Sequence, residues 1–174
     1  MEEADLFKFS ITEKTRKITA ASLFLAMAMV LPLVTAQIPQ VGKMLCPMHF
    51  PVLLCGFICG PWYGLIIGFI APLLRFSIFG MPIIFPTGIM MCFELAAYGL
   101  CAGIFYSKSK KVFLSLTFAI IAGRLMRLAV YGVFNILFQI PLTWEIIFIG
   151  GFLQSLPGTA LQLAFIPPIV KRIM

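Results

Sequence analysis

Long apolar runs, interrupted by a few short polar segments, dominate this sequence. Of its 174 residues, 61% are hydrophobic and only 11% are charged, whereas roughly a quarter of the residues of a soluble domain are charged. Such a chain cannot cover itself with a polar surface, and a transmembrane helix needs about 20 apolar residues. The sequence therefore predicts an all-α membrane protein, a bundle of six transmembrane helices that forms a single integral membrane domain over residues 1–174.

Polar or Gly-Pro breaks separate six apolar segments. They cover approximately residues 18–36, 50–60, 62–79, 85–106, 112–138 and 144–170. The second segment is short, so we expect it to be tilted, partly irregular or shielded by its neighbours, because a lipid-facing segment must satisfy all of its backbone polar groups. Gly60-Pro61, which follows it, predicts a tight reversal of the chain.

The distribution of Lys and Arg predicts the orientation in the membrane. Basic residues gather before residue 18, in the break at 107–111 and at the C-terminus, whereas Lys43 is the basic residue of the loops on the opposite side. Cytoplasmic loops carry the excess of Lys and Arg. We therefore expect both termini to be cytoplasmic in a bacterial cell membrane. The formal charge of +7 then reflects topology and excludes a nucleic-acid-binding surface.

Four charged residues lie deep inside the apolar segments: Arg75, Glu94, Arg124 and Arg127. A charge at the middle of a bilayer costs about 2.5–3.5 kcal/mol on insertion scales, so such residues normally face a partner or a watery cavity. At about 1.5 Å per residue, Arg124 and Arg127 lie roughly 20 and 24 Å from Lys111. The other two reach a similar depth, so we expect all four charges to meet in the outer half of the membrane.

Three cations against one acid leave a surplus of positive charge. Arg124, Arg127, Tyr131 and Asn135 follow the spacing i, i+3, i+7, i+11, which places them on one helix face. Arg pairs with a carboxylate through two parallel hydrogen bonds, so these residues predict a binding site for a carboxylated solute. Gln154 is a further candidate contact, although amide residues also hold membrane helices together.

A structural role for the buried charges stays open. Glu94 with one Arg would then be an interhelical ion pair, and Arg75 would extend to the outer headgroups. In that case the protein is a membrane scaffold or assembly protein. A self-contained channel or secondary carrier is the other alternative.

The sequence contains no catalytic motif. Gly42-Lys43 lacks the upstream glycine and the following Ser or Thr of a phosphate-binding loop, so ATP hydrolysis requires separate partner ATPases. Cys55 and Cys59 lie one helical turn apart, but a structural zinc site needs four ligands and His49 is the single histidine. We expect no enzymatic activity, no cofactor and no metal.

A pattern of small residues extends over nearly all of the chain. It begins with an alanine-rich first segment at residues 20–26 and continues with recurring Gly, Pro and small residues between Pro51 and Thr87. Cys59-Gly60-Pro61 and Phe85-Pro86-Thr87 are its clearest parts. In this pattern the chain resembles the substrate-binding S components of energy-coupling factor (ECF) vitamin transporters. The resemblance implies that the chain binds a solute from outside and that a transmembrane coupling (T) subunit with two ATPase (A) subunits moves it.

The resemblance implies two further sites. S components dock on the coupling subunit through an Ala-x-x-x-Ala surface of the first span, and the nearest equivalent here is Ser22-x-x-x-Ala26. The first external loop gates the pocket in this family, which makes residues 37–49, with Lys43 and His49, a lid. For the solute, the positive surplus favours a carboxylated vitamin, with pantothenate first and a folate-like compound or haem as alternatives.

Overall fold

The computed structural model of the chain describes residues 2–35, 47–138 and 155–173. Six α-helices make up most of this part, and their bounds are α1 (Glu2–Thr35), α3 (His49–Cys59), α4 (Pro61–Phe79), α5 (Ile89–Ser109), α6 (Val112–Phe138) and α7 (Leu156–Ile173). A π-helical segment, Ile84–Gly88, precedes α5. These residues contain no strand, which confirms the all-α prediction.

Four helices of the described part are long and apolar enough to cross a membrane. They are α1, α4, α6 and α5 together with its π-helical segment. The helix α3 is too short, with 11 residues, and α7 has 18 residues and carries Lys171 and Arg172 in its last turn. The beginning of the sixth predicted segment, residues 144–154, falls outside the described residues. By length and apolarity the structure therefore supports four of the six predicted spans.

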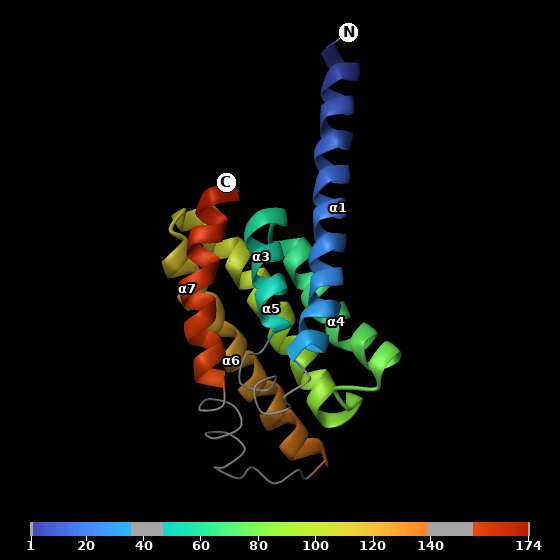
Figure 1. The fold of residues 1–174 in the computed structure, drawn as a ribbon, viewed down its shortest axis with the longest axis vertical. Helices are drawn as coiled ribbons and strands as arrows, with labels where there is room; N and C mark the ends of the chain where they lie inside the picture. Colours follow the sequence, from blue (N-terminus) through green and yellow to red (C-terminus); the bar gives the residue numbers. More distant parts are fainter. Residues whose placement is uncertain (1, 36–46, 139–154, 174) are drawn as a thin grey trace.

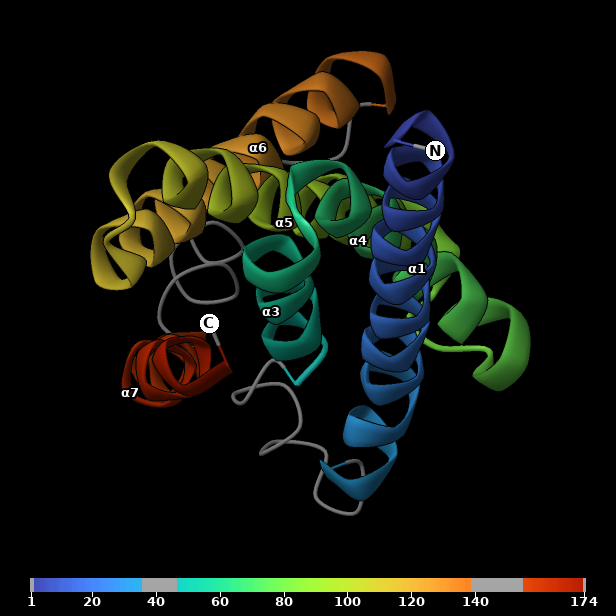
Figure 2. The ribbon, with the colours of Figure 1, turned by 90° about the horizontal axis from the view of Figure 1, so that it is seen from above.

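The short helix α3 lies at the centre of the bundle. It packs against α1, α4, α5 and α7, and the view from above shows it between α1 and α7 with α5 behind it (Figure 2). Every residue from Pro51 to Phe57 is buried. Because neighbouring helices surround it, α3 does not need the length of a lipid-facing span, as its short apolar segment led us to expect.

Glycines bring the backbones of α4 and α5 into contact. These two helices form the most extensive contact of the described part. A Cβ atom on Gly64 would lie 2.6 Å from the carbonyl oxygen of Gly99, and one on Gly103 would lie 2.5 Å from the backbone nitrogen of Pro61. Small residues allow this close approach between membrane helices. The contact therefore tolerates no side chain at these positions.

A single residue, Gly60, separates α3 from α4. Its φ of 103° lies in a region that glycine adopts readily and other residues rarely adopt. Pro61 then begins α4, at a position where the missing N–H leaves no helical hydrogen bond unmade. The reversal predicted at Gly60-Pro61 is confirmed.

The fourth predicted segment, residues 85–106, lies within the candidate span Ile84–Ser109, although the regular helix begins and ends a few residues later than predicted. Phe85 has an extended backbone, with φ −116° and ψ 132°, and regular helix runs from Ile89 to Ser109. Lys110 ends α5 in the left-handed region, where its N–H donates to the carbonyl of Tyr106. Hydropathy follows the polarity of side chains, whereas a helix ends where its backbone hydrogen bonds end.

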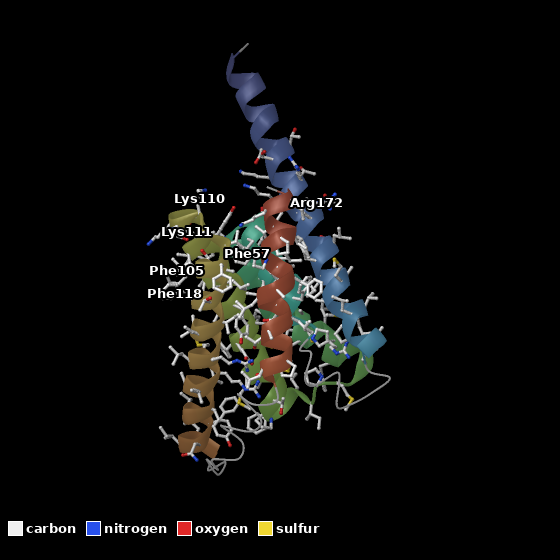
Figure 3. The ribbon with its side chains drawn as sticks, turned by 60° about the vertical axis from the view of Figure 1, so that its left-hand side comes forward. Phe57, Phe105, Lys110, Lys111, Phe118 and Arg172 are labelled. Atoms are coloured by element: carbon white, nitrogen blue, oxygen red, sulfur yellow. The ribbon has the colours of Figure 1, made fainter. Side chains whose placement is uncertain are left out.

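The basic segments share one end of the molecule. Figure 1 shows the N-terminal part of α1 and the end of α7 toward the same end of the bundle as the connection between α5 and α6. Lys110, Lys111 and Arg172 mark this end in Figure 3. The structure thus groups at one end the basic residues whose distribution predicts the orientation.

The glycine contact between α4 and α5 makes a prediction for Gly64→Ala. The added methyl group meets backbone atoms that cannot move aside, so we expect a loss of about 1–3 kcal/mol of stability and a lower melting temperature in detergent. Gly132→Ala on α6 is the matched control, because a Cβ there meets nothing within 4 Å. Equal melting temperatures for the two variants would contradict the close contact.

Candidate functional site

A buried carboxylate, that of Glu94 on α5, is the centre of the candidate site. None of its surface is exposed. One oxygen, Oε1, accepts hydrogen bonds from Tyr98 Oη at 3.2 Å and from Arg124 Nη1 at 3.3 Å. The other, Oε2, accepts one from Arg127 Nη1 at 3.1 Å. A buried charge requires such partners, and here both carboxylate oxygens have them.

The sequence of α6 explains why two guanidinium groups reach one carboxylate. Arg124 and Arg127 are three residues apart, so they lie on the same face of the helix. The residue before Arg124 is Gly123, where a Cβ would lie 2.7 Å from the ring of Tyr98. The glycine therefore lets the Tyr98 ring lie against the backbone of α6, next to the two cations.

Ser155 connects the cluster to α7. Its hydroxyl accepts a hydrogen bond from Arg124 Nη2 and is buried. Its carbonyl accepts one from the hydroxyl of Thr159, one turn into α7. Arg124 thus joins α5, α6 and the beginning of α7. Gln154, which precedes Ser155 in the sequence and is a predicted substrate contact, lies outside the described part of the chain.

His49 also faces Glu94, from the beginning of α3. Its Nε2 lies 3.8 Å from Glu94 Oε1, which is longer than a hydrogen bond. The imidazole packs edge to face against Tyr98, with 5.1 Å between ring centroids, and is 3% exposed. The structure places His49 in the first turn of α3, buried against Tyr98 and Glu94, and its role as a lid residue stays a prediction.

Arg75 does not join this cluster. Its Nη1 donates to the carbonyl of Met29 on α1 at 3.4 Å, and its guanidinium lies 5.5 Å from the centre of the Phe79 ring. The expectation that four charges meet is therefore wrong for Arg75. That expectation was based on the depth of each residue in the membrane. Depth does not determine the side of the bundle toward which a residue points.

The cluster keeps a positive surplus without Arg75. Among the described residues, the single carboxylate of Glu94 faces two guanidinium groups. The side chain of Arg127 is 28% exposed, and its hydrogen bond in this part of the structure uses one of the five N–H donors of a guanidinium. Arg127 is therefore the residue best placed to pair with an added anion.

The remaining predicted residues lie as follows. Tyr131 is buried and Asn135 half-buried, farther along the face of α6 that carries both arginines. Ser22 and Ala26 are exposed on α1. Lys43 is not among the described residues. Within residues 2–35, 47–138 and 155–173, no group of three or more His, Cys, Asp or Glu side chains could hold a metal ion.

Comparison with known protein families gives a match over most of the chain. The family model described as ECF transporter, substrate-specific component, matches residues 16–170. This range contains Glu94 and the described residues that contact its carboxylate. Comparisons with curated proteins and with solved structures found no match.

The buried carboxylate predicts a large effect for Glu94→Gln. The substitution leaves two partly buried guanidinium groups without a counter-charge, and removal of one partner from a buried ion pair costs about 3–5 kcal/mol. We expect a strongly lowered melting temperature in detergent. The double variant Glu94→Gln with Arg127→Gln should recover part of the loss, since fewer unpaired charges remain.

Glu13→Gln is the control for this prediction. Glu13 pairs with Lys17 at 3.8 Å, and both side chains are 47% exposed, so the pair is worth roughly 0–1 kcal/mol. If Glu94→Gln melts at the same temperature as Glu13→Gln, the cluster does not hold the helices together.

Proposed function

Because the chain belongs to the family of substrate-specific components of ECF transporters, we propose that it captures a carboxylated vitamin or related micronutrient from outside the cell. The observation that carries this proposal is the buried cluster of Glu94, Arg124 and Arg127. A purely structural ion pair needs one guanidinium, whereas this cluster has two, and that of Arg127 is partly exposed. An anionic solute supplies the missing negative charge.

The carboxylate of the solute pairs with Arg127 in this proposal, and Tyr131 and Asn135 on the same helix face contact the rest of the molecule. A guanidinium fits a carboxylate through parallel hydrogen bonds. Pantothenate is the first candidate, followed by a folate-like compound and haem, all of which carry carboxylates. A neutral flavin is less suited, because it leaves the buried positive charge without a counter-charge.

The position of the cluster along α6 supports binding from the outside. Arg124 is twelve residues after Val112, which begins α6 at the basic end of the bundle. Twelve residues of helix rise about 18 Å, which is past the middle of a hydrocarbon core about 30 Å thick. With the basic end and both termini in the cytoplasm of a bacterial cell, the cluster lies in the outer half of a six-span bundle.

Transport requires partners. The family implies association with a transmembrane coupling subunit and ATPases, and we propose that two such ATPase subunits hydrolyse ATP while this chain binds and translocates solute without altering it. Ser22 and Ala26, exposed on α1, are the proposed docking surface, because small residues allow close approach of another helix. The segment that includes Lys43 is the proposed lid.

Ligand-dependent stabilisation tests this function. We would record the melting temperature of the purified chain with pantothenate, folate and haem. A ligand that binds only the folded state stabilises it by about 2.7 kcal/mol at a hundredfold excess over Kd. The solute that this chain captures should therefore raise the melting temperature. Arg127→Gln should abolish the shift.

Arg75→Gln is the matched control, since it removes an arginine that lies apart from Glu94. It should keep the ligand-dependent shift. A folded wild type that no anionic solute stabilises would favour a scaffold role, and solute flux through liposomes without ATPases would favour a channel or carrier.

A further inference from the structure

The buried side chain of His49 has no assigned role in solute binding. Both ring nitrogens, Nδ1 and Nε2, are buried without a hydrogen-bond partner, and they are the only such side-chain atoms in the described part of the chain. Buried polar atoms in proteins are nearly always paired, so an unpaired one requires an explanation. Packing does not explain why this residue is a histidine, because a phenylalanine would make the same edge-to-face contact with Tyr98.

The neighbours of His49 indicate which ring nitrogen is the hydrogen-bond donor in a neutral imidazole. Nε2 is the nitrogen that faces Glu94 Oε1, at 3.8 Å. A neutral imidazole carries one N–H donor and one acceptor, and the carboxylate favours the proton on Nε2. Nδ1 is then an acceptor, and its missing partner must be a donor.

The net charge of the cluster limits the charge of a ligand that could provide this donor. Among the described residues, Glu94 with Arg124 and Arg127 sums to one positive charge when His49 is neutral. One carboxylate on the ligand brings this sum to zero. A cation would raise the buried charge, and a dianion would reverse it, both of which are costly in a medium of low dielectric constant.

We propose that His49 is a substrate-binding residue and that the substrate is a monocarboxylate carrying a hydroxyl or amide-type N–H group. The carboxylate pairs with Arg127, and the O–H or N–H donates to His49 Nδ1. His49 faces Oε1 of Glu94 and Arg127 pairs with Oε2, so the two residues lie within the length of one small molecule. This inference rests on the proposed function and narrows its substrate class.

Four monocarboxylates serve as probes for the test. Pantothenate has hydroxyl and amide donors and biotin has ureido N–H donors, whereas lipoate and nicotinate have no such donor. Dissociation constants would be measured for the wild type, His49→Phe, His49→Asn and His49→Gln. The Asn amide reaches the position of Nδ1, and the Gln amide reaches that of Nε2, so these two variants separate the roles of the nitrogens.

We expect the wild type to bind a donor-bearing probe more tightly than the donor-free probes. His49→Phe should weaken that binding about tenfold, the size of one buried hydrogen bond, and leave donor-free binding unchanged. His49→Asn should retain most of the affinity and His49→Gln should not. A melting temperature of His49→Phe at or above that of the wild type would show that the loss is not due to misfolding.

Three results would overturn the inference, and they are distinguishable. If His49→Phe binds a donor-bearing probe as tightly as the wild type while Arg127→Gln does not bind it, His49 has no role and the proposed function stands. If the folded wild type binds folate or haem but none of the four probes, the inference fails and the proposed carboxylate site stands. If it binds none of these six compounds, both fail.

Discussion

The ion pairs of Glu94 with Arg124 and Arg127 are the interaction on which the arrangement of this molecule depends. A carboxylate with no exposed surface cannot stay ionised in an apolar bundle unless cations reach it, and these cations come from a different helix. Arg124 also donates to Ser155 at the beginning of α7. One buried charge thereby fixes the relative position of α5, α6 and α7 and leaves Arg127 partly open to an added anion.

A rigid support for this charge comes from the glycine contact between α4 and α5. Backbone atoms of Gly64 and Gly99 approach so closely that no Cβ fits between the helices, and α3 fills the centre of the bundle beside them. Glu94 lies five residues before Gly99 on α5, so its position is set by contacts that cannot slide without a clash. In the proposed function, such a support keeps the geometry of the site before a solute arrives, which lowers the entropic cost of binding.

Much of the architecture is predictable from hydropathy, because a lipid-exposed span must be apolar and about 20 residues long. The arginines of α6 are predictable as a pair from their spacing of three residues. The contacts made by His49 and Ser155 are not, because they depend on how separate helices meet. Tyr98 was missed although it lies four residues after Glu94, a spacing that places both on one helix face. The grouping of Arg75 with the others failed because sequence gives depth but not direction.

The central claim is that this cluster receives the carboxylate of a small solute, and the most direct test is native mass spectrometry of the purified chain. The small molecule that the protein retains from the cell would be released and identified. The account predicts one carboxylic acid per chain, present on the wild type and lost from Arg127→Gln. A retained compound without a carboxylate, or a carboxylic acid held equally well by Arg127→Gln, would contradict it.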